Sequence, residues 1–269
     1  MSATSPDYRA DDGGAYERFL GRWTQRLALP FIEFARLPPL GDVLEVGCGT
    51  GSLTLALVEQ RPQAHIFAVD VAEPYLTFAR TRAGGERVRF EVGDACRLNF
   101  PSGRFSAVLA QLVLNFVPDA EAAVGEMRRV SRPEGVVAAA VWDFRGGLVY
   151  QRLFWDTASG VDPAAAAARD RLFSHPLALP DGLIDLWRRA GLTSIERASI
   201  TIRMTYASFN DYWEPLLGGQ GPVGTYVQGL TPGMREKIEE RVRAAYLSGA
   251  GDGPRSMTAT AWAVRGVAP

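Results

Sequence analysis

Residues 43–53 read VLEVGCGTGSL and place one acid and three glycines at the end of an apolar run. Glu45 stands two residues before the first glycine, and Gly47, Gly49 and Gly51 alternate with other residues. A strand, a glycine-rich turn and a helix in this order can bind nucleotides and anions, because glycines let the backbone turn sharply and approach a ligand. We therefore expect a ligand at this turn.

The spacing and the charge of the stretch narrow the choice of ligand. A dinucleotide fingerprint needs GxGxxG or GxGxxA, but counting from Gly47 the third small position falls on Ser52. No Gly-Lys-Ser/Thr follows, so the phosphate-binding P-loop is absent. A carboxylate at Glu45 would also repel a pyrophosphate. The stretch is better suited to a ligand with a positive charge, such as an α-ammonium.

The elements that must position these residues alternate from residue 42 to about residue 144. Apolar strand candidates lie at 42–47, 65–70, 88–92, 105–110 and 135–142, and helix candidates at 51–60, 73–82 and 119–130. The strands are continuous apolar runs, as expected when helices cover both faces of a sheet. Alternating strands and helices predict a parallel sheet with right-handed crossovers, which is a doubly wound α/β core.

Outside that core the pattern is less regular. Residues 1–14 are small and polar and predict a disordered tail, and 15–35 have helical spacing that is interrupted near Gly21 and Pro30. After residue 144 come an aromatic-rich insert with an alanine-rich helix, a helix at 181–192 and a strand at 194–204. A partly helical insert to about 255 precedes the alternating residues 256–266, which predict an edge strand. We expect a tail and lead-in helix over 1–41, then one domain over 42–269 with cap inserts at about 144–180 and 205–255.

The glycine motif resembles the signature of class I S-adenosylmethionine-dependent methyltransferases, in which an acid precedes GxGxG. The resemblance implies a Rossmann-like, doubly wound, mostly parallel seven-stranded sheet with an antiparallel C-terminal edge strand and helical cap inserts. It also implies S-adenosylmethionine as cofactor, a ligand with an amino-acid end and an adenosine end but no phosphate. Gly47, Cys48 and Gly49 would then admit its methionyl and ribose portions, and Glu45 would favour its positive charge.

Later motifs agree with this resemblance and occur in the family's order. "AVD" ends the second strand at Asp70, whose carboxylate would accept both ribose hydroxyls, and the next residue, Val71, would pack on the adenine. "GDA" at residues 93–95 is similar to the motif whose acid, here Asp94, accepts from the adenine amino group beside Ala95. "FSAVLAQLVLNFVPD" resembles the fourth-strand motif, in which Gln111 and Leu112 would border the methionine moiety. "PEG" at residues 133–135 would form the tight turn that enters the fifth strand.

The lead-in segment "AYERFLGRW" is similar to that of small-molecule methyltransferases of the ubiquinone and menaquinone biosynthesis type. That resemblance implies a helix folded over the cofactor, where Tyr16 and Arg22 could contact the methionine carboxylate or the acceptor. The alternative is an amphipathic packing helix with solvated arginines. Both interpretations stay open at the level of sequence.

No residue stands out as a catalytic acid or base. The weak candidate is His175, because it lies in the aromatic-rich insert that would cover the acceptor, where a histidine could take a proton. Cys48 is better explained as a small residue beside the cofactor than as a nucleophile, because methyl transfer needs no covalent enzyme intermediate. Aromatic residues in both inserts suit a cap core, an apolar acceptor pocket, or both.

Composition limits the partners. The 269 residues include 29 Lys and Arg against 30 Asp and Glu, so no electrostatic case exists for binding nucleic acid. Two cysteines without metal-type spacing suggest a reduced, cytoplasmic protein with no metal site, and no apolar run is long enough to span a bilayer.

The leading hypothesis is S-adenosylmethionine-dependent methyl transfer to a small, partly apolar molecule, through an O, N, C or S atom that the sequence leaves open. Two alternatives stay open. One is a nicotinamide-dependent oxidoreductase, and the other is a non-catalytic scaffold that retains the cofactor site.

Overall fold

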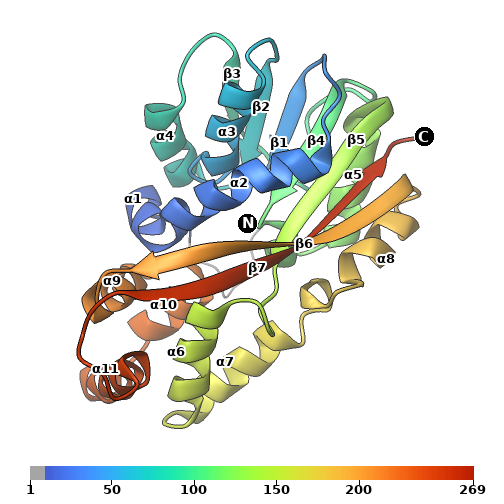
Figure 1. Ribbon diagram of the computed structural model, residues 1–269. Coiled ribbons are helices and arrows are strands. Elements are labelled where there is room, and N and C mark those ends of the chain that lie inside the picture. The colour runs from blue at the N-terminus through green and yellow to red at the C-terminus, as the bar shows by residue number, and fades with distance from the viewer. Residues whose placement is uncertain (1–9) are drawn as a thin grey trace.

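Seven strands form one mixed sheet in the order β3-β2-β1-β4-β5-β7-β6 in this computed structural model, which describes residues 10–269 (Figure 1). The strands are β1 (Val43–Val46), β2 (Ile66–Asp70), β3 (Val88–Val92), β4 (Phe105–Gln111), β5 (Ser131–Trp142), β6 (Thr193–Tyr206) and β7 (Arg255–Val267). The first five strands pair in parallel, and β7 runs antiparallel to both of its neighbours, β5 and β6. The predicted doubly wound, mostly parallel, seven-stranded sheet with an antiparallel C-terminal strand is therefore confirmed.

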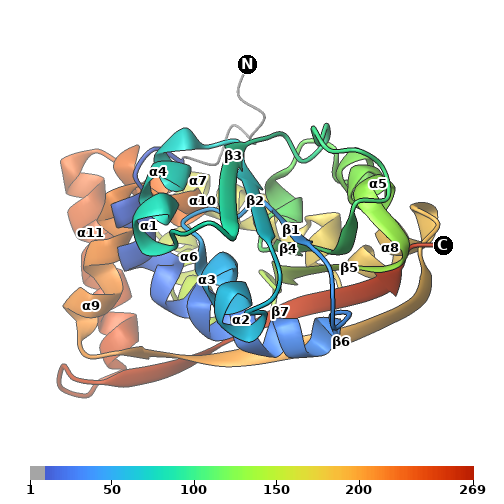
Figure 2. The same ribbon diagram turned by 90° about the horizontal axis from the view of Figure 1, so that it is seen from above.

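The position of that last strand differs from the prediction. The edge strand is β6, and β7 lies between β5 and β6. The two strands form a long ribbon that runs from α8 (Gly182–Arg189) past the parallel sheet to α9 (Phe209–Trp213) (Figure 2). Away from the parallel sheet, the ribbon buries a single face, as at Met204 and Ala259, while residues such as Arg203 are exposed. The alternation in the sequence therefore reports one-sided burial rather than a sheet edge.

Two helical layers cover the parallel sheet. On one face lie α2 (Arg22–Ala35) and α3 (Ser52–Gln60), and α4 (Glu73–Arg82) extends this layer beside β2 and β3. On the other face lie α5 (Ala120–Val130) and α8. Successive residues of β1 show the division, because Val43 joins the α2–α3 core and Leu44 joins the α5–α8 core. Both side chains are fully buried, which explains the continuous apolar runs of the sequence.

The lead-in segment is one continuous helical stretch. It begins with α1 (Gly13–Tyr16), passes through a π-helical turn, η1 (Glu17–Gly21), and continues as α2. The irregularity predicted near Gly21 corresponds to the end of the π-helical turn. The break predicted at Pro30 is wrong, because α2 continues past it and buries Leu27 and Phe31 on either side. Tertiary packing there outweighs the hydrogen bond that proline removes.

Two further predictions need correction. The disordered tail predicted over residues 1–14 is wrong at its end, because Asp12 caps α1 by accepting the backbone N–H of Ala15 at 2.9 Å. Residues 1–9 lie outside the described range of the chain. The tight turn predicted at residues 133–135 is a bulge within β5, where pairing jumps from Phe105 with Ser131 to Ala107 with Val136.

The two inserts predicted after the core form a helical cluster around the far ends of β6 and β7 (Figure 1). Its helices are α6 (Val149–Ser159), α7 (Pro163–Phe173), η3 (Pro176–Ala178), α9, η4 (Glu214–Gly218), α10 (Gly221–Gln228) and α11 (Pro232–Leu247). In this cluster α6 packs against both α7 and α11, so segments far apart in the sequence share one core. Trp155, Tyr212 and Trp213 are almost completely buried in it.

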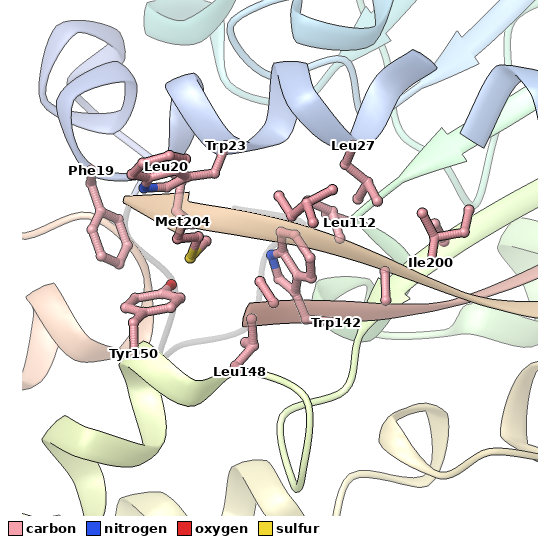
Figure 3. Packing of buried hydrophobic residues seen from close by; sticks show 14 of the residues in the cluster. Phe19, Leu20, Trp23, Leu27, Leu112, Trp142, Leu148, Tyr150, Ile200 and Met204 are labelled. Atoms are coloured by element: carbon pink, nitrogen blue, oxygen red, sulfur yellow. The ribbon is translucent and has the colours of Figure 1, made fainter. Parts of the chain in front are cut away.

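The lead-in helix joins this cluster to the parallel sheet. Trp23 packs edge-on against the Tyr206 ring at 5.5 Å, and Phe19 packs against the Tyr150 ring at 6.2 Å. Figure 3 shows the side chains of this seam between α2, β6 and α6, with Met204 among them. None of the helices in residues 10–269 is both long enough and apolar enough to cross a bilayer.

Candidate cofactor and acceptor sites

The glycine turn after β1 is held against the neighbouring strand. The backbone N–H groups of Gly47 and Cys48 both donate to the carbonyl of Val69 in β2, at 2.7 and 2.9 Å. Gly47, Gly49 and Gly51 have φ angles of +71°, +53° and +86°, in the region that favours glycine. The turn is therefore a strained path that only these residues adopt at low cost.

The three glycines have different surroundings. A Cβ on Gly47 would lie 2.3 Å from Cγ2 of Val113, and one on Gly51 would lie 3.3 Å from the Ala79 Cβ. A Cβ on Gly49 would meet nothing closer than the Tyr75 ring at 3.9 Å, because this glycine faces a cavity. Gly47 and Gly51 thus serve close packing, while Gly49 leaves space for a ligand.

Asp70, the last residue of β2, ties the turn to the next loop. One of its carboxylate oxygens accepts the N–H of Gly49 and the other accepts the N–H of Ala72, both at 2.8 Å. Burial raises the pKa of Asp70, and the backbone hydrogen bonds oppose that shift. A carboxylate has about four lone-pair sites, so Asp70 keeps capacity to accept further hydrogen bonds from a ligand.

Glu45 lies beneath the turn and is only 2% exposed. The hydroxyl of Thr54 in α3 donates to its Oε2 at 2.5 Å. Burial raises the pKa of Glu45 to about 8, the Thr54 hydrogen bond opposes the shift, and the charge of Asp70 adds to it. No cation within residues 10–269 pairs with this carboxyl group, although it lines the cavity. A bound ligand with an ammonium group would supply the missing charge.

These residues line one cavity with most of the predicted cofactor contacts. From the predicted set the structure brings together Tyr16, Glu45, Gly47, Cys48, Gly49, Asp70, Val71, Asp94, Ala95, Gln111 and Leu112. Gln111 is 8% exposed, donates through Nε2 to the carbonyl of Thr24 at 3.1 Å, and leaves its Oε1 buried without a partner. Such an orphaned oxygen is costly unless a ligand satisfies it. The residues present therefore fit a ligand that carries donors at this point.

Arg22 is the exception, because it does not line the cavity. Its guanidinium forms an ion pair with Asp211 at 2.9 Å and lies over the Trp23 ring at 4.4 Å. The structure therefore does not bring Arg22 together with the other predicted residues, because its side chain joins α2 to α9. Tyr16 does line the cavity, with its ring centroid 5.1 Å from that of Tyr75.

Several residues that line the cofactor cavity were not predicted from the sequence. Thr24 lies on the buried face of α2, and its hydroxyl is 2.8 Å from that of Ser52 in α3. Tyr75, in the first turn of α4, is 2% exposed and lies across the cavity. A polar residue in the apolar stripe of a helix is a signal that could have revealed Thr24. Tyr75 gave no such signal, because aromatic residues in helices usually pack in the core.

Two hydrogen-bonded links hold the lead-in segment over the cavity. Glu17 pairs with Arg82 of α4 at 2.6 Å and accepts the hydroxyl of Thr50 at 2.7 Å. The hydroxyl of Tyr75 donates to Gln220, just before α10, whose amide donates to Asp11 at 2.8 Å. The cofactor cavity is therefore connected to both the lead-in segment and the helical cluster.

A second cavity of about 400 Å³ lies between the cofactor cavity and the helical cluster. Phe116 lines both cavities. The second is lined by Asn115, Phe116, Phe144, Trp155, Ala164, Ala167, Ala168, Arg171, Leu172, His175, Pro222, Thr225 and Tyr226. Most of these side chains are apolar or aromatic, as is usual for sites that bind small molecules.

His175 lines the second cavity, but its geometry does not suit a general base. Its Nδ1 accepts the backbone N–H of Leu177 at 3.2 Å and so caps η3. Burial lowers the pKa of His175, so the neutral ring carries its proton on Nε2. The nitrogen that remains available is therefore a donor. Cys48 is equally unsuited as a nucleophile, because burial, followed by the charges of Glu45 and Asp70, raises the pKa of its thiol.

The fold is a Rossmann-like α/β sheet with a cavity at the carboxyl ends of its parallel strands, and comparison with known proteins relates it to methyltransferases. Residues 44–139 match the family described as "Methyltransferase domain". Two curated relatives are demethylmenaquinone methyltransferase of Thermus thermophilus, 41% identical over 42% of this chain, and nocamycin O-methyltransferase of Saccharothrix syringae, 25% identical over 68% of this chain. These alignments cover 51% and 70% of the two relatives, so the first is matched over about half its length.

Solved structures show the same fold. A Bacillus halodurans C-125 protein described as a methyltransferase superposes with a TM-score of 0.58 at 18% identity, covering 90% of this chain and 98% of that one. Phosphoethanolamine N-methyltransferase 2 of Haemonchus contortus, solved with S-adenosylhomocysteine, also gives 0.58, at 16% identity, covering 96% of this chain and 57% of that one. Residues 44–139 therefore match a methyltransferase domain, and over most of its length the chain has the same fold as methyltransferases of known structure.

Proposed function

We propose that this chain transfers a methyl group from S-adenosylmethionine to a small-molecule acceptor that binds in the second cavity. The observation that carries the proposal is the shared wall at Phe116, which places a cavity lined by cofactor-type residues beside an aromatic-lined cavity. Two adjoining sites of this kind can hold a methyl donor and an apolar acceptor in reach of each other.

The proposed roles of the cofactor residues follow from their positions. Glu45 and Gln111 would hold the ammonium end of the methionine moiety, with Leu112 beside it, and Asp70 would accept the ribose hydroxyls. Asp94 already accepts the N–H of Cys96 through one oxygen at 2.8 Å, and its second oxygen would accept from the adenine amino group. The remaining contacts would come from Tyr16, Gly47, Cys48, Gly49, Val71 and Ala95, which line the same cavity.

Positioning is the main contribution that the chain would make to the reaction. S-adenosylmethionine supplies a methyl group on a sulfonium, which is already a strong electrophile. Holding reactants in near-attack geometry can account for about 7–11 kcal/mol of a barrier. The chain's own residues would orient the acceptor, because Phe116, Phe144, Trp155 and Tyr226 present rings to the second cavity.

Domain organisation and location belong to the same proposal. Residues 42–269 would form the methyltransferase domain after a tail and lead-in helix over 1–41, with the segments at about 144–180 and 205–255 as caps over the acceptor. We also propose a cytoplasmic location, because both cysteines are free thiols, as is usual in a reducing compartment. The partner would be a small, partly apolar molecule rather than a nucleic acid, in keeping with the net charge of −1.

The test is methyl transfer by the purified chain. Labelled S-adenosylmethionine is incubated with phenols, quinols, carboxylic acids, amines and thiols of small aromatic skeletons, and labelled products are separated by chromatography. The proposal predicts enzyme-dependent labelling of at least one class and strong loss in Asp70→Ala. Hydride exchange with a nicotinamide cofactor would support the oxidoreductase alternative. Cofactor binding without turnover on any class would support the scaffold alternative.

A further inference from the structure

We infer that the second cavity takes an acceptor that presents an oxyanion to the cofactor cavity and keeps an apolar, planar body away from it. This inference rests on the function proposed above and adds the chemical class of the acceptor. Three properties of the cavity carry it: its orientation relative to the cofactor cavity, the shape of its walls and the nature of its polar groups.

The orientation follows from the short helices at one end of the cavity. Asn115 and Phe116 belong to η2 (Leu114–Phe116), and η2 packs against η3, which His175 caps. Because Phe116 also lines the cofactor cavity, Asn115 and His175 lie at the end next to the methyl donor. The reacting head of an acceptor must therefore meet these two side chains.

The shape follows from α7. Ala164, Ala167, Ala168 and Leu172 are spaced so that they share one face of this helix, and all four line the cavity. Their small side chains leave room opposite the rings of Trp155 and Tyr226, whose centroids are 5.3 Å apart. A cavity bounded by methyl groups and flat rings is suited to a planar apolar body.

The polar groups favour oxygen over a cation. Within residues 10–269 no Asp or Glu lines the cavity, so an ammonium acceptor would find no opposite charge there. Arg171 contributes a positive charge, and His175 contributes the donor Nε2–H. The Thr225 hydroxyl is buried without a partner and can donate, and Asn115 can donate only through its Nδ2 amide group, because its Oδ1 is an acceptor. This set of groups recognises an anionic oxygen.

The same groups leave no base to deprotonate an acceptor. The Nδ1 lone pair of His175 is occupied by the N–H of Leu177. The hydroxyl of Tyr226 donates to Asp162 at 2.5 Å, and burial raises its pKa, so it stays protonated. An oxyanion needs no base: its electron pair forms the new C–O bond, the methyl carbon's bond to sulfur breaks with its pair left on sulfur, and no proton moves. The sulfonium and oxyanion charges cancel in the products.

The experiment compares three probes that share one body and differ in the head group. Binding of 2-naphthoate, 2-naphthalenemethanol and 2-naphthylmethylammonium is measured by calorimetry with the protein saturated by S-adenosylhomocysteine. We expect 2-naphthoate to bind at least about tenfold more tightly than the ammonium probe, with the alcohol between them. Tighter binding of the ammonium probe, or no binding of any probe at millimolar concentration, would overturn the inference.

Variants of α7 locate the site. Arg171→Gln should remove most of the preference for 2-naphthoate, whereas Arg169→Gln, on the same helix but outside the cavity lining, should leave it unchanged. Ala168→Leu should weaken all three probes, and Ala166→Leu, also outside the lining, should not. An anion preference that survives Arg171→Gln, or equal effects in each matched pair, would contradict the assignment.

The two proposals can fail separately. The titration with S-adenosylhomocysteine that precedes each measurement reports the cofactor site alone. If that ligand binds and the probes show the wrong preference, only the acceptor class is refuted. If that ligand does not bind to the wild-type chain, the proposed function is refuted at its first step.

Discussion

The carboxylate of Asp70 accepts the backbone N–H of Gly49 at 2.8 Å, so the acid at the end of β2 and the glycine turn after β1 form one unit. The same acid that the sequence assigns to ribose recognition also holds the turn in shape. The hydrogen bonds to the turn, together with the proposed contact to ribose, would offset the cost of burying this carboxyl group, whose pKa is raised by burial.

Replacement of Asp70 tests that double role. Asp70→Ala removes an acceptor for two ligand hydroxyls and an anchor of the turn, and we expect a net loss of about 1.5–3 kcal/mol, the range for hydrogen bonding to a charged group. We expect affinity for S-adenosylhomocysteine to fall by roughly tenfold to a hundredfold in calorimetry. Asp70→Asn keeps one acceptor oxygen and should lose less. A dissociation constant unchanged in Asp70→Ala, with the fold intact by circular dichroism, would show that Asp70 does not contact the cofactor.

Glu45 predicts a pH dependence of cofactor binding. Its carboxyl group in the ligand-free protein is protonated below its pKa of about 8, and a bound ammonium would favour the charged form and lower that pKa. Binding should therefore release a proton near pH 7. Affinity should rise by up to about tenfold per pH unit from pH 6 toward pH 8 and level off above it.

Calorimetry in buffers with different ionisation enthalpies measures this proton release. Glu45→Gln is the matched control, because it keeps the shape of the side chain and cannot titrate. Proton release in the wild-type protein and none in Glu45→Gln is the expected pair of results. Equal proton uptake or release in both proteins would assign the titration to another group.

The glycines of the turn predict an order of stability. Gly103 is a control for backbone strain, because its φ of +71° equals that of Gly47 and nothing lies within 4 Å of its would-be Cβ. Gly103→Ala and Gly49→Ala should each lower the free energy of unfolding by about 1–2 kcal/mol. Gly47→Ala adds the clash with Val113 and should lose about 1–3 kcal/mol more.

Urea denaturation measures these differences, and titration with S-adenosylhomocysteine separates the two glycines of the site. Gly49→Ala should weaken binding well beyond its effect on stability, because its methyl group enters the cavity. If Gly47→Ala is as stable as Gly103→Ala, the argument that Gly47 is needed for close packing is contradicted. If Gly49→Ala binds S-adenosylhomocysteine as tightly as the wild-type protein, the cavity at Gly49 is not the ligand site.

His175→Ala should lower kcat by less than roughly tenfold, because Nδ1 is already committed to Leu177 and the ring can only donate. The larger effect should be on KM, because the variant loses the Nε2–H group that would donate a hydrogen bond to the methyl acceptor. His175→Asn keeps both an acceptor for the Leu177 N–H and a donor, so it should recover some of the loss in KM. A thousandfold loss of kcat with cofactor affinity intact would instead identify His175 as the base.

Most residues that line the candidate cofactor cavity could be predicted from the sequence, because they lie at or follow the ends of adjacent parallel strands. Glu45, Asp70, Asp94 and Gln111 each belong to or follow a separate strand, and sheet order β3-β2-β1-β4 brings those strand ends together. The periodicity of strands and helices determines this arrangement. Periodicity therefore predicts that these strand ends meet, and the resemblance to methyltransferase motifs indicated which residues at those ends line the cavity.

The rest depended on contacts between distant segments. Arg22 pairs with Asp211, which is 189 residues away, and Tyr75 donates a hydrogen bond to Gln220, which is 145 residues away. No local sequence pattern predicts either contact. The second cavity could not be predicted from the sequence either, because the alanines of α7 indicate only that this segment forms a helix readily. Their role emerges when α6 and α10 place rings opposite them.

Calorimetric titration of the purified chain with S-adenosylhomocysteine and with NAD, under one set of conditions, tests the central claim most directly. Glu45 beneath the turn, Asp70 beside it and the orphaned Gln111 oxygen predict saturable binding of S-adenosylhomocysteine at one site per chain. NAD should give no binding heat, because Ser52 stands where the dinucleotide fingerprint needs Gly or Ala. Binding of NAD without any response to S-adenosylhomocysteine would contradict the account.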